Sequence, residues 1–330
     1  MNSLKGFATG IGSLPHQDTE QAIDLIFKYI PYMPFWPQLP KLNPFERMIP
    51  QFSENIPLKE EDLELFYEKV ITKDLDYFKI TPDYAAGLYA FIQRLENGGP
   101  GGIEAIKIQT TGPFTFAAGT KDVNDVALLH NKVFFQAILK GLSLKALWQI
   151  SLFKKFNKQL AIFIDEPFLG SFGSAYTPIN REDVVLGLND FTEELKSENV
   201  LIGVHCCGNT DWSIFTDIKN IDIINFDAFD FQEKFVLYAN DLNKFLKKGG
   251  IICWGIVPTQ EFTGQENVEL LVRKIREGIE ALTKKGIDPE LLKENLLISP
   301  ACGLGTFTPQ KAESIFALLS ETSNFIQKNF

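Results

Sequence analysis

The chain has 330 residues, of which 45% are hydrophobic and 22% are charged, and its formal net charge is −10. This composition is typical of a globular protein with a large buried core, and it excludes a disordered chain. The sequence has no basic stripe, no apolar run of about 18 residues and no apolar signal segment at its start. We therefore expect no nucleic-acid partner, no membrane partner and a cytoplasmic location.

Short apolar runs rich in β-branched and aromatic residues alternate with longer patterns of helical period. Such runs are typical of parallel strands that are covered on both faces. The strands that we expect are Phe7–Gly12, Ala105–Thr110, Leu160–Asp165, Val200–Cys206, Ile221–Phe226, Ile251–Ile256 and Leu296–Ser299. Their number and the chain length favour a closed (β/α)8 barrel, the TIM barrel, and we expect one such domain over residues 1–330.

The segment Pro31–Pro57 interrupts this alternation with many prolines and aromatic residues. It is too apolar for a free linker, so we expect an irregular but ordered excursion that packs over one barrel end. Two helices are clearly marked later in the chain. Residues 268–282 place their apolar side chains on one helical face, and Thr308-Pro309 starts a helix that is expected to reach about Ile326.

Polar and small residues collect where the apolar runs end. In a parallel barrel the carboxyl ends of all strands open on one face, where active sites are built. Residues far apart in the sequence are therefore expected to converge there. The groups concerned are Gly12-Ser13, Thr110-Thr111-Gly112-Pro113, Asp165-Glu166-Pro167, His205-Cys206-Cys207-Gly208-Asn209, Asp227 and Pro300-Ala301-Cys302-Gly303.

The pair His205 and Cys207 is the most specific of these groups. Side chains alternate between the faces of a strand, so these two point the same way and Cys206 points the other way. An imidazole and a thiolate two residues apart can hold one ion, and zinc accepts both. Cys302, at a later strand end, is the expected third ligand, and Asp227 is the expected fourth, oxygen ligand.

Buried cysteine is also common in protein cores, so one histidine and one cysteine at this spacing are a weak pattern by themselves. We expect Cys206 in the barrel wall and Cys253, which lies within an apolar run, in the core. No disulfide is expected among the four cysteines in a reducing cytoplasm.

Two further groups are candidates for substrate binding. Asp165 and Glu166 are adjacent, so they cannot share one face of a strand. One of them is expected to enter the barrel mouth and hold an amine or a cation, while the other is paired or solvated. The turn at Gly12 and Ser13 could bring backbone groups close to a ligand. The alternatives are an ordinary strand-end acid and a simple turn.

At these positions the sequence resembles the catalytic C-terminal barrel of cobalamin-independent methionine synthase, in the superfamily that includes uroporphyrinogen decarboxylase. The matches occur in the order of the family and span nearly the whole chain. They are Gly12-Ser13-Leu14-Pro15, Thr111-Gly112-Pro113, Ile164-Asp165-Glu166-Pro167, His205-x-Cys207, Asp222-Ile223-Ile224-Asn225-Phe226-Asp227 and Cys302-Gly303-Leu304.

The resemblance implies a zinc-dependent thiol methyltransferase. It matches His205, Cys207 and Cys302 to the zinc ligands of the family. Asp227 matches the position of a glutamate ligand, with one methylene fewer. Asp165 and Asp227 are accordingly the expected catalytic residues.

The resemblance also implies homocysteine as the small-molecule thiol substrate, with methionine as the product. Gly12 and Ser13 match a loop that binds the amino-acid part of homocysteine through its backbone. Asp165 matches an acid that holds the substrate ammonium, and Glu54 matches a second such acid. With Glu166, these residues make up the expected substrate-binding set.

The methyl donor is open between a methylated corrinoid and methyltetrahydrofolate. The segment from His205 to Thr210 is similar to the strand end of corrinoid-dependent methyltransferases in the same superfamily, in which zinc activates coenzyme thiols. The N-terminal barrel that helps the long methionine synthases to bind folate has no counterpart in these 330 residues. Both features favour a methylated corrinoid, free or carried by a corrinoid protein.

Two other functions remain as alternatives. The first is a decarboxylase similar to uroporphyrinogen decarboxylase, which needs cationic residues to hold several carboxylates, and no arginine lies near the first strand end. The second is a non-catalytic zinc- or corrinoid-binding module, whose metal would have no open coordination position.

Overall fold

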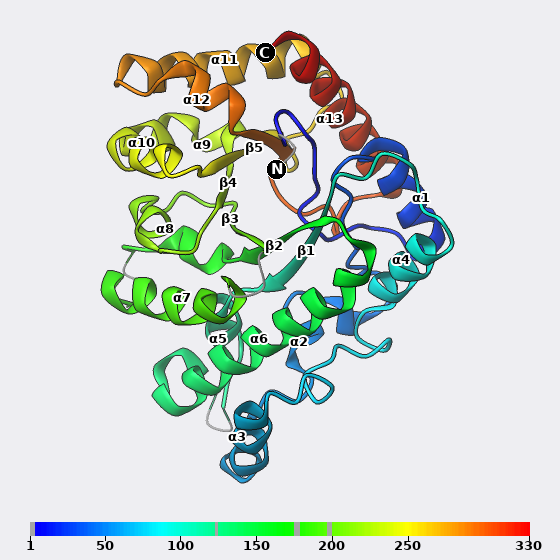
Figure 1. Ribbon diagram of the computed structural model, residues 1–330, viewed down its shortest axis with the longest axis vertical. Helices are drawn as coiled ribbons and strands as arrows, with labels where there is room; N and C mark the ends of the chain where they lie inside the picture. Colours follow the sequence, from blue (N-terminus) through cyan, green and yellow to red (C-terminus); the bar gives the residue numbers. More distant parts are fainter. Residues whose placement is uncertain (1–3, 123–124, 175–178, 197–199) are drawn as a thin grey trace.

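The computed structural model describes residues 4–122, 125–174, 179–196 and 200–330. Over these residues, six parallel strands pair in chain order in one sheet that curves around a common axis, with helices on the outside (Figure 1). The strands are β1 (Ala105–Thr111), β2 (Gln159–Asp165), β3 (Leu201–Cys206), β4 (Ile223–Asp227), β5 (Ile251–Val257) and β6 (Leu296–Pro300). This arrangement confirms the predicted α/β barrel class.

Helices connect the strands and cover their outer faces. The α-helices of the described residues are α1 (Thr19–Tyr29), α2 (Pro50–Ser53), α3 (Leu63–Thr72), α4 (Ala86–Glu96), α5 (Pro113–Gly119), α6 (Lys132–Phe153), α7 (Arg181–Lys196), α8 (Ser213–Asp217), α9 (Ala228–Phe235), α10 (Ala239–Lys247), α11 (Val268–Lys284), α12 (Pro289–Glu294) and α13 (Pro309–Asn329). Short 3-10 turns are η1 (Pro44–Glu46), η2 (Glu60–Asp62), η3 (Leu128–His130), η4 (Lys154–Phe156), η5 (Pro167–Ser171) and η6 (Val236–Tyr238).

An extended segment near the N-terminus lies beside β6. The Ile298 N–H donates to the Phe7 carbonyl and the Thr9 N–H donates to the Ile298 carbonyl, both at 3.0 Å. The expected strand Phe7–Gly12 is therefore in place, but it forms a single parallel bridge, at Ala8, instead of a regular ladder.

A second extended segment, residues 32–38, lies between the first one and β1. The Gln38 N–H donates to the Gly12 carbonyl at 3.0 Å, and the Lys107 N–H of β1 donates to the Pro34 carbonyl at 2.9 Å. The two segments thus complete the ring between β6 and β1. Prolines at positions 31, 34, 37 and 40 lack an N–H, so a regular ladder cannot form here.

The expected excursion over one barrel end is therefore wrong for residues 32–38, which lie in the barrel wall. The remainder, residues 39–57, approaches the carboxyl end of β1, where the Thr111 hydroxyl donates to the Met48 carbonyl at 2.6 Å. The short elements η1 and α2 belong to this part of the chain.

The barrel interior changes from apolar to polar along its axis. Toward the amino ends of the strands, the buried cluster consists of Met33, Ala105, Ala161, Phe163, Ile223, Cys253 and Leu297. Closer to the carboxyl ends, the buried interior residues are polar: Lys107, Gln109, Asn225 and Ser299. This polar layer leads to the strand ends from which the functional side chains project.

Both helices that the sequence marked are confirmed. In α11, the side chains of Leu271, Val272, Ile275, Ile279 and Leu282 are buried on one face. Helix α13 begins at Pro309, directly after the cap residue Thr308, whose side chain accepts a hydrogen bond from the Lys311 N–H. It continues three residues beyond the expected end.

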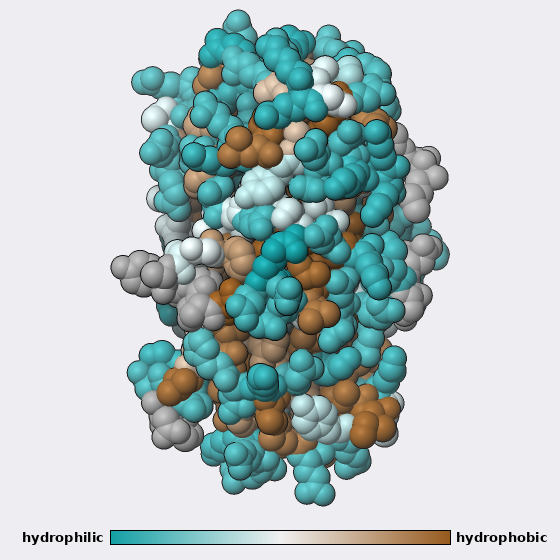
Figure 2. Space-filling view, turned by 90° about the vertical axis from the view of Figure 1, so that its left-hand side faces the viewer, coloured by the Kyte–Doolittle hydropathy of each residue, from teal (hydrophilic) through white to brown (hydrophobic). Residues whose placement is uncertain are grey.

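The face of the molecule drawn in Figure 2 carries mostly hydrophilic residues. Figure 2 shows the side formed by the helices on the left of Figure 1, where hydrophobic residues occur in limited patches between polar ones. None of the described helices is long and apolar enough to span a membrane.

Candidate metal centre

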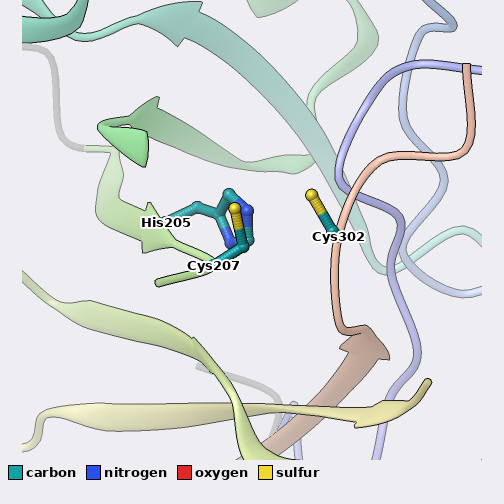
Figure 3. A group of neighbouring side chains, drawn as sticks. All are labelled: His205, Cys207 and Cys302. Atoms are coloured by element: carbon teal, nitrogen blue, oxygen red, sulfur yellow. The ribbon is translucent and has the colours of Figure 1, made fainter. Parts of the chain in front are cut away.

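The ends of β3 and β6 bring three potential metal ligands together. One donor atom from each of His205, Cys207 and Cys302 lies within 4.8 Å of the other two. Among the described residues, these three side chains form the cluster that could hold a metal ion. Figure 3 shows the three side chains around a common space, His205 and Cys207 from the end of β3 and Cys302 from the segment after β6. His205 is buried, and both cysteines are half-buried.

Strand alternation explains why two of these side chains share one face. Cys206, between them, points outward and is fully buried, with its thiol 3.6 Å from the Gly208 carbonyl. The turn that follows packs its backbone against the backbone of the loop after β2. A Cβ at Gly208 would lie 2.8 Å from the Gly170 Cα, so only glycine allows this close approach. The expected position of Cys206 in the barrel wall is confirmed.

The two thiols of the site share a hydrogen bond that shifts their pKa values in opposite directions. A hydrogen bond from Cys207 lowers the pKa of the Cys302 thiol, and His205 acts in the same direction, while burial opposes both. The same hydrogen bond, together with burial, raises the pKa of Cys207. One thiolate at Cys302 is therefore favoured before any metal is bound, and a thiolate is the form of cysteine that binds metals.

Asp165 lies beside this group at the end of β2, where it is the register partner of His205. Its side chain is buried, and its Oδ1 atom has no hydrogen-bond partner among the described residues. Burial raises the pKa of Asp165 to about 6, whereas the charges of Lys107 and His205 lower it. A buried carboxylate oxygen without a partner is costly, so this atom is well suited to accept from a ligand.

The turn at Gly12 and Ser13 packs directly against the segment that carries Cys302. The Leu304 N–H donates to the Ser13 carbonyl at 2.9 Å, and a Cβ at Gly303 would collide with the Ser13 hydroxyl. Gly12 has a φ of +151°, and a Cβ there would lie 2.5 Å from the Gln38 side-chain oxygen. The structure thus brings this predicted pair to the metal centre.

Asp227, the expected fourth ligand, lies outside the group of His205, Cys207 and Cys302. Its Oδ1 atom caps α9, accepting from the Phe229 and Asp230 N–H groups at 3.0 Å. Helix capping by a strand-end aspartate is a common use of this side chain, and the shorter side chain keeps the carboxylate at the helix.

If the site binds zinc, we predict that Asp227→Ala binds it with the same stoichiometry as the unchanged protein and keeps any activity within a few-fold. The substitution removes a helix cap, which costs about 1 kcal/mol of stability. Zinc stoichiometry, activity and thermal unfolding measure these effects. Loss of zinc in a folded variant would restore Asp227 as a ligand.

Glu166 is also not available to a substrate, although it was expected in the substrate-binding set. Its carboxylate accepts from the Phe114 and Thr115 N–H groups at the start of α5, at 2.9 and 2.8 Å, and from the Thr115 hydroxyl at 2.6 Å. A Cβ at Gly112 would collide with this carboxylate, so glycine is needed there. Of the two adjacent acids, Asp165 enters the barrel mouth and Glu166 holds a helix.

Glu54 has a local structural contact. Its two carboxylate oxygens accept from the Thr81 N–H and the Thr81 hydroxyl, at 3.0 and 3.1 Å. The side chain therefore ties two connecting segments together, and among the described residues the structure does not bring it into the group of His205, Cys207 and Cys302.

Sequence reasoning missed two polar residues of the barrel interior. The buried ammonium of Lys107 donates to the Ile11 carbonyl and, at 3.1 Å, to the Gln109 side chain. Burial lowers its pKa to about 8. Asn225 lies 2.6 Å from the Nδ1 atom of His205. The available signal was a polar side chain at an inward position of an otherwise apolar strand.

Comparisons with known proteins leave the family open. No family model and no curated protein matches the sequence. Among solved structures, the chain is similar to a Bacteroidetes-affiliated GH5 cellulase, with 12% identity, 74% of this chain and 79% of the cellulase covered, and a TM-score of 0.41. It is also similar to 3-keto-D-glucoside 4-epimerase from E. coli, with 10% identity, coverage of 74% and 85%, and a TM-score of 0.39.

A third similar structure is D-psicose 3-epimerase, with 12% identity, coverage of 79% and 93%, and a TM-score of 0.36. None of these three proteins is described as a methyltransferase. Likeness at this level concerns the barrel fold and carries no argument about activity.

Proposed function

We propose that this protein is a zinc-dependent thiol methyltransferase that methylates homocysteine to methionine. The observation that supports the proposal best is the meeting of His205, Cys207 and Cys302 within 4.8 Å at the carboxyl ends of two distant strands. One imidazole and two thiolates suit zinc better than magnesium or calcium, which prefer oxygen ligands.

The number of ligands favours a catalytic site over a structural one. Structural zinc sites use four protein ligands, whereas catalytic sites use three and leave a position for substrate. Three side chains lie within reach here, and the carboxylate of Asp227 caps a helix instead. Both cysteines are half-buried, which suits access from the barrel mouth.

Zinc, when bound, would lower the pKa of a coordinating thiol and so supply a nucleophilic sulfur at neutral pH. The chain's own residues would bind and orient the substrate. The unpartnered Oδ1 of Asp165 would accept from the substrate ammonium, and the turn at Gly12 and Ser13 would bind the amino-acid part of homocysteine. Two fixed contacts of this kind align the sulfur with the methyl donor.

The favoured donor is a methylated corrinoid, free or on a corrinoid protein, and the other candidate is methyltetrahydrofolate. The likeness of the segment from His205 to Thr210 to corrinoid-dependent enzymes supports this choice. We place the reaction in the cytoplasm, because thiolate ligands must stay reduced.

The test is metal analysis followed by incubation of the zinc-loaded protein with homocysteine and either methylcobalamin or methyltetrahydrofolate. We expect equimolar zinc and methionine formation with methylcobalamin. A zinc-loaded protein that forms no methionine with either donor would contradict the proposal and favour a non-catalytic binding module. Release of carbon dioxide from a tetrapyrrole carboxylate would favour the decarboxylase.

A further inference from the structure

Asn225 occupies a fully buried position in the barrel interior, between His205 on β3 and the end of β6. Its Oδ1 atom lies 2.6 Å from the Nδ1 atom of His205. Its Nδ2 group donates to the Cys253 carbonyl and to the Ser299 hydroxyl oxygen, both at 2.9 Å. Asn225 and Ser299 are 0% exposed and His205 is 2% exposed, so water does not compete for these contacts.

The neighbours of Asn225 leave its amide one orientation. The Cys253 carbonyl can only accept a hydrogen bond, so the NH2 group of Asn225 must face it. The Ser299 hydroxyl donates to the Pro300 carbonyl at 2.9 Å, so its oxygen is free to accept the second amide hydrogen. Both hydrogens of the Nδ2 group are then used, and the Oδ1 atom must face His205.

This orientation determines which imidazole nitrogen carries the proton. The Asn225 Oδ1 atom is an acceptor, so the His205 Nδ1 atom at 2.6 Å must be the donor. In a neutral imidazole with the proton on Nδ1, the Nε2 atom has the free lone pair. The hydrogen bond also fixes the plane of the ring.

We propose that Asn225 is a positioning residue that holds His205 in the Nδ1-protonated tautomer and presents the Nε2 atom to the metal. This inference rests on the proposed zinc site and deepens it. Metal-ligating histidines commonly donate their second N–H to an oxygen that orients the ring. Here the oxygen belongs to a network that continues through Ser299 to Pro300, two residues before Cys302. The two strand ends that carry the ligands are thereby linked through β4.

The direct test uses the unchanged protein. The chain contains only three histidines, so nitrogen-15 NMR of histidine-labelled protein resolves each ring, with His16→Gln and His130→Gln variants for assignment. We expect Nδ1 of His205 to be protonated both without and with zinc, and the Nε2 resonance to shift when zinc is added. An unprotonated Nδ1, or zinc bound through Nδ1, would overturn the proposal.

Two substitutions test the role of Asn225 itself. Asn225→Leu keeps a similar size but has no acceptor, and we expect its zinc affinity to fall about 10- to 100-fold. Asn225→Asp keeps an oxygen acceptor toward His205 but turns a second oxygen toward the Cys253 carbonyl, so we expect it to recover only part of this loss. Ser143→Ala, which removes a buried hydroxyl in α6, is the control for a general loss of packing.

Competition with a chromophoric chelator measures these affinities in the absence of thiol and methyl donor. The zinc affinities therefore test the role of Asn225 independently of the methyltransferase activity. The proposed function, in contrast, would fail if a normally zinc-loaded protein formed no methionine. Wild-type zinc affinity and an unchanged His205 spectrum in Asn225→Leu would show that Asn225 does not set the tautomer.

Discussion

Replacing Cys302 with alanine is expected to release zinc and abolish thiol methylation. The substitution removes one of the three donor atoms that lie within 4.8 Å of one another. It also removes the thiolate that the hydrogen bond from Cys207 favours. The two ligands that remain come from one strand end, so we expect zinc affinity to fall by at least about 100-fold. Chelator competition and methionine formation measure the two effects.

Cys206→Ala is the matched control for this prediction. Cys206 is adjacent to Cys207 in sequence, but it points into the wall and is fully buried. We expect its replacement to leave zinc stoichiometry and activity unchanged, with a modest loss of stability from the small cavity. If Cys302→Ala retained equimolar zinc and full activity, the proposed ligand set would be refuted.

Replacing Asp165 with asparagine is expected to raise the KM for homocysteine about 30- to 150-fold while zinc remains bound. The substitution keeps the shape of the side chain but removes the charge that would hold the substrate ammonium. Loss of a buried charge-assisted hydrogen bond costs about 2–3 kcal/mol, which corresponds to this change. Steady-state kinetics with homocysteine and with a thiol that lacks the amino group measure the effect.

Glu166→Gln is the control for this second prediction because it changes the neighbouring carboxylate. We expect it to lower the free energy of unfolding by about 1–3 kcal/mol, since it weakens the cap of α5, and to leave the KM for homocysteine unchanged. The opposite pattern, with a normal KM in Asp165→Asn and a raised KM in Glu166→Gln, would show that Glu166 binds the substrate ammonium and Asp165 does not.

Much of the fold could be predicted from the sequence because strands buried on both faces have a strong and simple pattern. The six strands of the sheet follow from this pattern. The position of α11 follows from its helical period, and the start of α13 follows from the cap at Thr308-Pro309. The pairing of His205 with Cys207 follows from strand alternation, which is a local property. Their meeting with Cys302 required one further step, that parallel strands end on one face.

Properties that depend on long-range contacts could not be predicted in the same way. Residues 32–38 look irregular because their prolines prevent a regular ladder, yet they lie in the barrel wall through a few hydrogen bonds. Asp227 and Glu166 occur at strand ends like Asp165, but helix N-termini lie within their reach and use their oxygens. The role of Asn225 depends on neighbours from β3, β5 and β6, which no local pattern reveals.

X-ray absorption at the zinc edge, with and without homocysteine, tests most directly whether the protein activates a thiol on zinc. We predict two sulfur ligands at about 2.3 Å in the zinc-loaded protein, with nitrogen or oxygen ligands completing the shell, and a third sulfur when homocysteine is added. A sulfur count that stays at two with saturating homocysteine, or a zinc shell without cysteine sulfur, would contradict the account.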